Sequence, residues 1–376
     1  MSTGRVGLYA VDQDLRTTAT IGVFNYTRRL IHGLADIQEP GFSMVLWLSA
    51  SNAESLSPAS LPPWMQVRSI NSAASTGWRR LRADHLQVRQ LVADDAVDVV
   101  HFPKGWMPLI RPRRARSVAT LHDTILHYCR EHDCLPPGSD MRWRYFEWML
   151  CHALNRADLV IAPSPSTADS LAAISTGARG KIRTVPTGAI DGDVAPLAVE
   201  AKRGVLVMGS TSPHKATAET LMLLDGYART RDSALPVTVV GLDDLDGLRE
   251  LAPPQHLEIT CTGRISNEQL QRTMQQSRVL AYLSLVEGFG LPLLEAYSTG
   301  TAVCYRDTSA LADVMDGIPG GWDGQGHESF VEALDRAMAL STSDILDIRQ
   351  DLRERFPPER CIADTVSVYR EALSMS

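Results

Sequence analysis

Two glutamates eight residues apart flank the stretch with the clearest potential for chemistry, residues 284–296 (SLVEGFGLPLLEA). Glu287 precedes, and Glu295 follows, a loop that contains Gly288 and Gly290. Glycine lets backbone N–H groups approach a ligand closely, and the N-terminus of the helix predicted after the loop adds partial positive charge. Carboxylates placed there can accept hydrogen bonds from the vicinal hydroxyls of a sugar or ribose. The alternative is that Glu295 only complements the helix dipole and the glycines only form a turn. That alternative would be preferred for two glutamates at this spacing alone, but the Gly-Phe-Gly-Leu-Pro between them favours a ligand site.

A lysine follows a second glycine turn. Residues 204–209 are predicted to form a buried strand that ends at Gly209, and Lys215 lies shortly before the next predicted helix. The departure of a diphosphate builds negative charge, which a lysine and backbone amides can stabilise. A solvated surface lysine is the alternative reading of such a residue. The position of Lys215 after a strand and a glycine favours an anion-binding site.

His122 directly follows a predicted strand, residues 117–121, so it is expected at the carboxyl edge of a sheet. His127 and His132 have no comparable position. A metal-dependent transferase would use an Asp-x-Asp pair to hold Mn²⁺ or Mg²⁺ with the diphosphate. Three such patterns occur, and we interpret all of them as solvated: Asp12 with Asp14, Asp191 with Asp193, and Asp244 with Asp246. We therefore predict no metal site.

Short apolar runs alternate with helical patterns along the whole chain, which is typical of parallel α/β sheets. In the first half, strands are predicted at 6–11, 43–48, 97–101, 117–121 and 157–163, and helices at 22–34, 78–94, 139–155 and 166–174. In the second half, strands are predicted at 204–209, 236–241, 256–262, 278–284 and 302–305, and helices at 217–230, 267–276, 292–298, 329–339, 348–356 and 361–374.

This alternation predicts two Rossmann-like domains, as the length of 376 residues also favours. We place the first domain at residues 1–190 and the second at 191–360, with a linker at 191–203. The last helix, within 361–376, is expected to pack back on the first domain. Because ligands of such sheets bind at the carboxyl ends of the strands, two facing sheets would form a cleft.

The composition is that of a globular enzyme, with 44% hydrophobic residues and a net charge of −7. An acidic chain is a poor general binder of nucleic acid. The basic cluster at residues 111–116 (RPRRAR) is interpreted as a solvated loop, with contact to an anionic acceptor or lipid headgroup as the alternative. Six scattered cysteines suggest reduced thiols. No apolar run is long enough to span a bilayer, so we predict a cytoplasmic protein, with the inner face of the membrane as a further location.

Several segments together resemble family 4 of the retaining glycosyltransferases, which have the GT-B fold. They are residues 287–296 (EGFGLPLLEA), 208–215 (MGSTSPHK), 262–270 (TGRISNEQL), 121–124 (LHDT), 162–166 (APSPS) and 185–188 (VPTG). The resemblance covers nearly the whole chain in the right order. It is specific for the family and much less specific for the sugar or the acceptor.

The resemblance implies transfer of a hexose-type sugar from a nucleotide-diphosphate sugar, GDP- or UDP-linked, to a hydroxyl of a glycan, lipid-linked saccharide or small molecule. No cofactor is implied. The second domain would bind the donor and the first the acceptor. Glu287 would hold sugar hydroxyls, Glu295 the ribose and Lys215 the diphosphate. The implied catalytic residues are His122, Lys215 and Glu287, and the implied donor-binding residues are Gly22, Gly209, Ser210, His214, Lys215, Arg264, Gly288, Phe289, Gly290, Leu291 and Glu295.

The chain departs from the family at two positions. Gly22 lies where the family's first loop approaches donor and acceptor, but the usual paired glycines are replaced by Thr-Ile-Gly. Many members have Arg before the lysine, whereas this chain has His214. If His214 contacts the diphosphate as an imidazolium, which we favour, donor affinity should fall as pH rises. If it does not, Arg264 is the next candidate for the missing charge.

Two other functions remain open at this level. A nucleotide-sugar 2-epimerase can share the fold, and so can a non-catalytic partner subunit. A decayed site would usually lose Lys215 or one of the two glutamates, and this chain keeps all three. The same-face course of attack implied by the family needs no covalent carboxylate nucleophile, and no carboxylate is evident as one.

Overall fold

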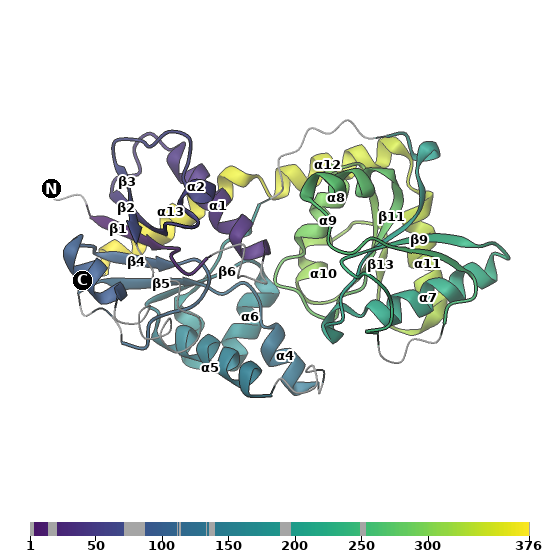
Figure 1. The fold of residues 1–376 in the computed structure, drawn as a ribbon, viewed down its shortest axis with the longest axis horizontal. Helices are drawn as coiled ribbons and strands as arrows, with labels where there is room; N and C mark the ends of the chain where they lie inside the picture. The colour runs from purple at the N-terminus through teal and green to yellow at the C-terminus, as the bar shows by residue number, and fades with distance from the viewer. Residues whose placement is uncertain are drawn as a thin grey trace. The chain divides into compact units, whose positions relative to one another are not determined.

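The computed structural model describes residues 4–13, 21–70, 87–110, 112, 114–132, 134, 140–188, 197–248 and 253–375. The chain divides into two compact units (Figure 1). The first unit consists of Met1–Thr124, Met141–Gly188 and Pro358–Ser376, and the second of Ile125–Asp140 and Ala189–Pro357.

The first unit is built on a seven-stranded parallel sheet with strand order β3-β2-β1-β4-β5-β6-β7. The strands are β1 (Arg5–Tyr9), β2 (Ser43–Ser49), β3 (Met65–Ile70), β4 (Val99–Phe102), β5 (Arg116–Thr120), β6 (Leu159–Ala162) and β7 (Ile182–Thr184). The helices are α1 (Ile21–Ala35), α2 (Ala53–Leu56), α5 (Asp140–Arg156), α6 (Pro165–Ile174), the 3-10 helix η1 (Thr176–Lys181) and α13 (Pro358–Ser374), and residues 87–94 are also helical.

Both faces of this sheet are covered, as parallel sheets require. Successive side chains of a strand point to opposite faces, so Leu8 packs in the cluster beneath α1 and α13, whereas the adjacent Tyr9 packs in the cluster that includes Leu154 of α5 and Leu171 of α6. The fully buried Trp47 on β2 belongs to this second cluster. Because both faces are covered, functional side chains are expected at the carboxyl ends of the strands.

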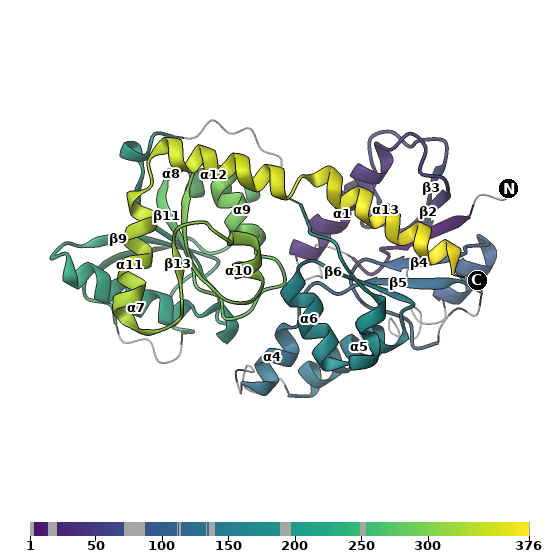
Figure 2. The same ribbon diagram turned by 180° about the vertical axis from the view of Figure 1, so that it is seen from behind.

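The last helix, α13, runs across β4 and β5 (Figure 2). Its Tyr369 is fully buried, and the hydroxyl is hydrogen-bonded to His101 Nδ1 at 2.7 Å. His101 Nε2 is bonded in turn to Thr120 Oγ1 at 2.8 Å. Arg183 and Glu371 form an ion pair that also ties α13 to β7. The C-terminal helix is therefore held against the first sheet by buried hydrogen bonds as well as by apolar packing.

Acid is expected to weaken this unit through His101. Burial, and to a lesser degree His122, lowers the pKa of His101 to about 3, whereas an unfolded histidine has a pKa of about 6.5. The unfolded state therefore binds the proton first, so the stabilisation is complete above pH 6.5 and is lost as pH falls toward 3. Between pH 7.5 and 5.5 we expect a loss of about 1.4 kcal/mol in the free energy of unfolding from this residue.

Urea unfolding at pH 7.5 and 5.5 measures this effect. The variant His101→Gln keeps hydrogen-bonding groups but cannot titrate, so its stability should change less between the two pH values than that of the wild type. Equal changes in both proteins would show that His101 does not contribute to the pH dependence.

The second unit is built on a six-stranded parallel sheet with strand order β10-β9-β8-β11-β12-β13. The strands are β8 (Arg203–Met208), β9 (Leu235–Val240), β10 (Leu257–Cys261), β11 (Ser277–Tyr282), β12 (Ala302–Arg306) and β13 (Gly321–Trp322). The helices are α4 (Ile125–Glu131), α7 (Thr217–Thr230), α8 (Asn267–Gln276), α9 (Leu291–Ser298), α10 (Ser309–Met315), α11 (Gly326–Ala339) and α12 (Thr342–Arg355), with 3-10 helices η2 (Val199–Ala201) and η3 (Pro213–Lys215).

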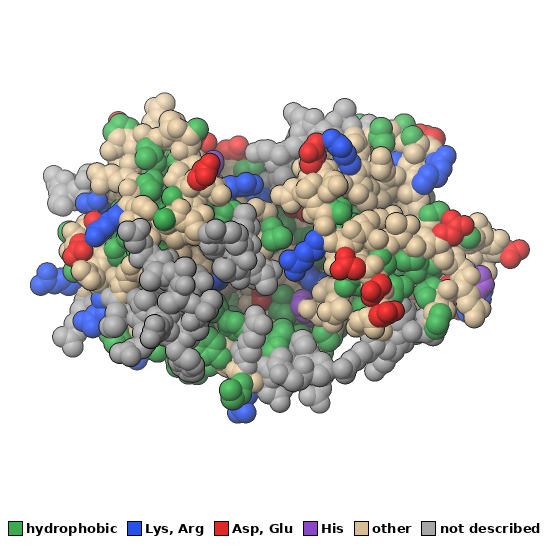
Figure 3. Space-filling model, viewed as in Figure 1, with side chains coloured by type: hydrophobic (Ala, Val, Ile, Leu, Met, Phe, Trp, Pro, Cys, Tyr) green, Lys and Arg blue, Asp and Glu red, His purple; other side chains and the backbone are tan. Residues whose placement is uncertain are grey.

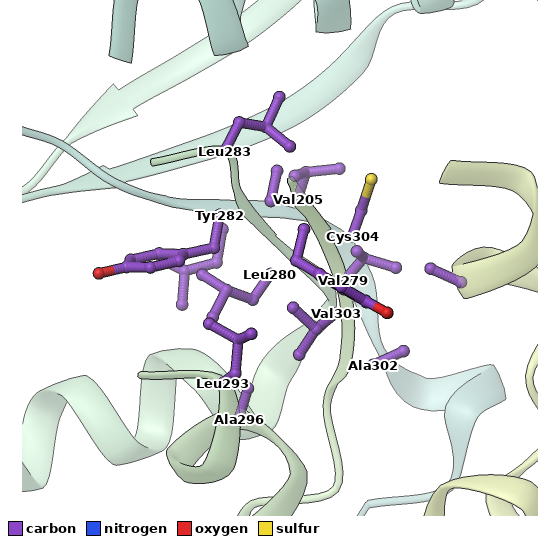
Figure 4. Close-up of a cluster of buried hydrophobic side chains, with 14 of the residues drawn as sticks. Val205, Val279, Leu280, Tyr282, Leu283, Leu293, Ala296, Ala302, Val303 and Cys304 are labelled. Carbon is purple, nitrogen blue, oxygen red and sulfur yellow. The ribbon is translucent and has the colours of Figure 1, made fainter. Parts of the chain in front are cut away.

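Apolar side chains of β8, β11 and β12 form the centre of the second unit's core together with α9 (Figure 4). Tyr282, the last residue of β11, lies at the margin of this cluster and directs its hydroxyl away from the labelled apolar side chains (Figure 4). Only 4% of Tyr282 is exposed. A buried tyrosine hydroxyl normally requires a polar partner, and the partners of this one define the candidate site below.

Two α/β units with parallel sheets are the predicted fold class, and most predicted elements occur with boundaries shifted by one or two residues. Ser164 caps α6, and its hydroxyl accepts a hydrogen bond from the Thr167 amide. The predicted helix 78–94 is described only from residue 87. Residues 191–196 of the predicted linker lie outside the described part. Elements that the pattern missed are β3, β7, β13, α2, α4 and α10.

Acidic and basic side chains are interspersed on the face shown in Figure 3. Of the basic cluster 111–116, Arg111 and Arg113 lie outside the described residues. Arg114 is exposed. The interpretation of the whole cluster as a loop is wrong for Arg116, which begins β5 and pairs with Asp158 at 3.3 Å. All six cysteines are free thiols. Within the described ranges, every helix is too short or too polar to cross a membrane.

Candidate functional site

The candidate site lies at the carboxyl edge of the second sheet, between β8 and β11. Strand order runs outward in one direction from β8 through β9 to β10, and in the other from β11 through β12 to β13. The connections after β8 and β11 therefore leave toward opposite faces, and such a switch point is where open α/β sheets bind ligands. Lys215 lies in the segment after β8, and Glu287 in the segment after β11. The topology thus brings the two predicted charged residues together.

Lys215, Glu287 and Tyr282 form a compact polar triad. Lys215 Nζ lies 2.5 Å from Glu287 Oε1 and donates to the Tyr282 hydroxyl at 3.0 Å. The Tyr282 hydroxyl donates to the same carboxylate oxygen of Glu287 at 2.7 Å. The Lys215 side chain is 26% exposed and that of Glu287 11%, so the lysine is the member of the pair more accessible to a ligand. Lys215 and Glu287 are residues predicted from the sequence, whereas Tyr282 is not.

The triad favours the charged forms of both ion-pair partners. Burial opposes the charge on Lys215, but the oxygens of Tyr282 and Glu287 outweigh it and raise the pKa of the ammonium. Burial would likewise raise the pKa of Glu287, yet Lys215 and hydrogen bonds from Lys215, Tyr282 and Ser284 lower it. Burial raises the pKa of Tyr282, which remains a neutral donor. At neutral pH the site therefore holds one full positive and one full negative charge.

The segment that carries Lys215 is held in a tight conformation. Thr217 Oγ1 accepts from the Ser210 amide at 3.0 Å and donates to the Ser210 carbonyl at 2.9 Å. Ala216, between Lys215 and α7, has φ +50°, a left-handed conformation that costs a non-glycine residue free energy. A Cβ at Gly209 would lie 2.5 Å from Val239 Cγ1, so packing between strands explains this glycine without any ligand.

His214 is buried, with 8% of its surface exposed. Its carbonyl accepts a hydrogen bond from the Leu285 amide at 2.8 Å, which joins the two loops of the site. Nδ1 has no hydrogen-bond partner within the described part of the chain. Burial first, and then the neighbouring Lys215, lowers the pKa of His214 to about 4, against a smaller opposing effect of Glu287. The imidazole is therefore neutral near pH 7 in the free protein.

This neutrality revises the expected pH dependence of donor binding. A charged His214 at pH 7 would require the bound diphosphate to overcome both burial and Lys215, so we now expect donor affinity to be nearly constant between pH 6.5 and 8. The dissociation constant of the donor, measured against pH for wild type and His214→Arg, tests this expectation. If the donor affinity of the wild type falls steadily over this range while that of His214→Arg stays constant, this expectation is wrong. The result would instead support contact between a charged His214 and the diphosphate.

The glycine loop ends in a left-handed residue. Gly290 has φ +95°, and a Cβ there would lie 2.6 Å from Leu311 Cδ2, so both conformation and space favour glycine. Phe289 is buried and packs edge-on against Phe356 with ring centroids 5.4 Å apart. Its side chain belongs to the core, which leaves its backbone for any ligand contact. Leu291 and Glu295 are half-buried on α9.

Arg264 follows β10 and is exposed. The loops after β8, β9 and β10 are joined by backbone hydrogen bonds, from the Gly209 amide to the Val240 carbonyl and from the Gly241 amide to the Gly263 carbonyl. The structure thus places Arg264 at the same edge of the sheet as Lys215, two strands away from β8. It belongs to the periphery of the edge rather than to the triad.

His122 lies just after β5 in the first unit, as predicted from the sequence. Its Nε2–H donates to the Pro103 carbonyl at 2.7 Å, and its ring meets Tyr26 edge-on at 4.7 Å. Burial lowers the pKa of His122 to about 4, against a smaller opposing effect of the Pro103 bond. The ring is therefore neutral near pH 7, with Nδ1 as a hydrogen-bond acceptor. Gly22 lies in the first turn of α1 and is exposed.

The solvated interpretation of the Asp-x-Asp patterns is wrong for Asp12. This residue is 9% exposed, and its side chain pairs with Lys104 at 3.4 Å, while Lys104 Nζ also donates to the Asp12 carbonyl at 3.1 Å. The pair joins the segments after β1 and β4, at the switch point of the first sheet. Asp244 and Asp246 are exposed as expected. Asp14, Asp191 and Asp193 lie outside the described residues.

The comparison with protein families agrees with this geometry. Residues 21–190 match the model of Glycosyltransferase Family 4, and residues 194–355 match the model of Glycosyl transferases group 1. Fold and site define a GT-B-like protein with two parallel α/β sheets. The chain belongs to glycosyltransferase family 4.

Curated relatives are similar over part of their length. The chain is 27% identical over 234 residues to O-antigen chain mannosyltransferase B of Escherichia coli, covering 58% of this chain and 59% of that protein. It is 25% identical over 217 residues to O-antigen chain mannosyltransferase RfbU of Salmonella typhimurium, covering 55% and 60%. A putative glycosyltransferase of Acidianus filamentous virus 2 is 32% identical over 123 residues, 30% of this chain and 35% of that protein. The chain thus spans about a third to three fifths of the curated relatives it matches.

Solved structures share the fold over almost the whole chain. Sucrose-phosphate synthase of Thermosynechococcus elongatus superposes with a TM-score of 0.68 at 17% identity, covering 99% of this chain and 100% of that one. The HepE protein of Anabaena, solved in complex with UDP and glucose, superposes with a TM-score of 0.64 at 14% identity, covering 98% and 100%. At such identities the likeness establishes the fold alone.

Proposed function

We propose that this protein is a retaining hexosyltransferase that uses a nucleotide-diphosphate sugar as donor and a hydroxyl as acceptor. The observation that carries the proposal is the position of Lys215. Its ammonium lies at the switch point of the second sheet, beside Glu287 and next to the loop that leads into α9. An anionic diphosphate is the ligand class that such a cation, neighbouring backbone amides and a helix N-terminus would bind together.

Each group has a defined part in the proposed reaction. The acceptor oxygen forms a bond to the anomeric carbon while the bond from that carbon to the diphosphate oxygen breaks. The departing diphosphate takes the acceptor proton, and Lys215 stabilises the charge that develops on it. Glu287 holds hydroxyls of the transferred sugar, and Glu295 holds the ribose. Same-face attack preserves the anomeric configuration.

The identity of the sugar is proposed from the relatives. Two of them are named O-antigen chain mannosyltransferases, so mannose from a GDP-linked donor is the first combination to test, followed by UDP-glucose. The first unit is proposed to bind the acceptor. There the neutral His122 presents an acceptor nitrogen at the carboxyl edge of the sheet and can receive a hydrogen bond from a sugar hydroxyl.

Product analysis tests this function against the epimerase and the non-catalytic subunit. The protein is incubated with GDP-mannose or UDP-glucose, with and without a lipid-linked saccharide mixture. Acceptor-dependent release of GDP or UDP, with a new α-linked saccharide from an α-linked donor, is the expected result. A 2-epimerised nucleotide sugar formed without acceptor would instead identify an epimerase, and binding without any turnover would identify a partner subunit.

We also expect transfer to need no divalent metal. Lys215 can neutralise part of the diphosphate charge. Across the described ranges, no three or more His, Cys, Asp or Glu side chains are grouped to hold a metal ion. Activity measured in excess EDTA should therefore remain within about twofold of the untreated rate. Loss of activity in EDTA with recovery in Mn²⁺ or Mg²⁺ would contradict this expectation.

A further inference from the structure

The charge balance of the triad has a consequence for ligand binding. In the free protein the Lys215 ammonium already has an anionic partner, because Glu287 Oε1 lies 2.5 Å away. A diphosphate oxygen that bound Lys215 would take the position of a carboxylate oxygen. Glu287 would then be a second anion close to the bound diphosphate. Two anions that need the same cation must compete for it.

Tyr282 can hold Glu287 in place when the diphosphate binds Lys215. Its hydroxyl donates to Glu287 Oε1 at 2.7 Å, and this bond does not involve the lysine. Ser284 also donates to the carboxylate. Tyr282 is the last residue of β11 and directs its hydroxyl out of the apolar cluster (Figure 4). The carboxylate therefore keeps hydrogen-bond donors on its own loop and strand after Lys215 has turned to another anion.

We propose that Glu287 occupies Lys215 as a placeholder for the diphosphate in the free protein, and that Tyr282 is the positioning residue that retains Glu287 when the donor displaces it. The inference rests on the proposed function, since it takes the ligand of Lys215 to be a nucleoside diphosphate. Exchange of partners then couples donor entry to the release of the Glu287 carboxylate, which becomes available to the sugar hydroxyls as the diphosphate binds.

Titration calorimetry with free GDP and UDP tests the exchange. Glu287→Gln removes the competing charge, so this variant should bind the nucleoside diphosphate about fivefold to tenfold more tightly than the wild type, even though sugar transfer falls. Tyr282→Phe leaves Glu287 with fewer donors in the bound state, so it should bind about threefold to tenfold more weakly. Because the tyrosine acts through the carboxylate, adding Tyr282→Phe to Glu287→Gln should cause no further weakening.

The chain offers a closely matched control in Tyr305. It is the register partner of Tyr282 on the neighbouring strand β12, it is 3% exposed, and its hydroxyl donates to the carbonyls of Met315 and Ile318. Tyr305→Phe removes a buried hydroxyl from the same sheet without touching the triad. It should lower the unfolding temperature about as much as Tyr282→Phe does, with nucleotide affinity unchanged.

Three results would overturn the inference. If Glu287→Gln binds the nucleotide no more tightly than the wild type, Glu287 and the diphosphate do not compete for Lys215. This measurement tests the inference even if Tyr282→Phe fails to fold. If Tyr282→Phe weakens nucleotide binding equally in the wild type and in Glu287→Gln, the tyrosine does not act through Glu287 and has only a structural role. A wild-type protein that binds neither GDP nor UDP overturns the proposed function and the inference together, which distinguishes that failure from the other two.

Discussion

Lys215→Ala is expected to lower kcat by about 10² to 10³ while weakening donor binding far less. The lysine already has a carboxylate partner in the free protein, so exchanging that partner for the diphosphate changes the ground state modestly. Its charge matters most when the leaving group acquires negative charge, and an interaction that strengthens in the transition state is lost from kcat. Steady-state kinetics with saturating donor, together with calorimetry, separates the two effects.

Lys202 supplies the control for this substitution. It is a buried lysine at the opposite end of β8, where its Nζ donates to the Gln275 carbonyl at 2.7 Å. Burial lowers its pKa to about 8. Lys202→Met should therefore cost stability and leave the kcat of the folded enzyme close to that of the wild type. Near-normal turnover of Lys215→Ala would remove the lysine from the mechanism.

Glu295→Gln is expected to weaken the binding of free GDP or UDP about 10-fold to 100-fold, because hydrogen bonds to a charged group contribute about 1.5–3 kcal/mol. The proposed partners are the ribose hydroxyls, which donate to a carboxylate better than to an amide. Glu295 lies on α9, beyond the left-handed Gly290 that starts the helix. The same titration should show the opposite change for Glu287→Gln, so one experiment assigns both glutamates.

The exposed Glu268 on α8, paired with Arg272 at 2.5 Å, is the matched control for a surface carboxylate. Glu268→Gln should bind the nucleotide as the wild type does. If Glu295→Gln also binds it unchanged, the ribose contact is wrong, and the nucleoside must be held by other groups at the carboxyl edge.

Elements with a local signal were predictable from the sequence. Helix α8 occurs as predicted because Ser266 and Gln269 form a capping box that fixes its first turn. The buried strands β8 and β9 are short apolar runs that only a covered parallel sheet accommodates. The edge strand β3 was missed because its middle residues are exposed or half-buried, and β13 because two residues carry no pattern.

Contacts between segments distant in sequence could not be predicted from the local sequence pattern. Lys215 and Glu287 were each recognised by local position, but their direct pairing depends on β8 lying beside β11, which the sequence order does not reveal. Tyr282 lies within the predicted strand 278–284, where nothing in the pattern distinguishes it, and only the three-dimensional arrangement gives its hydroxyl partners. The interpretation of Asp12 as solvated was wrong for the same reason, since Lys104 is distant in sequence but follows β4, the strand that pairs with β1.

A thermal-shift titration with UDP-, GDP-, ADP- and dTDP-sugars tests most directly whether the second unit binds a nucleotide sugar. A ligand at 100 times its dissociation constant adds about 2.7 kcal/mol to the stability of the unit that binds it. We predict that at least one of these donors raises the unfolding temperature of the wild type, and that Glu295→Gln requires a higher concentration for the same shift. A folded wild-type protein whose unfolding temperature none of the four donors changes at millimolar concentration would contradict the assignment of this site.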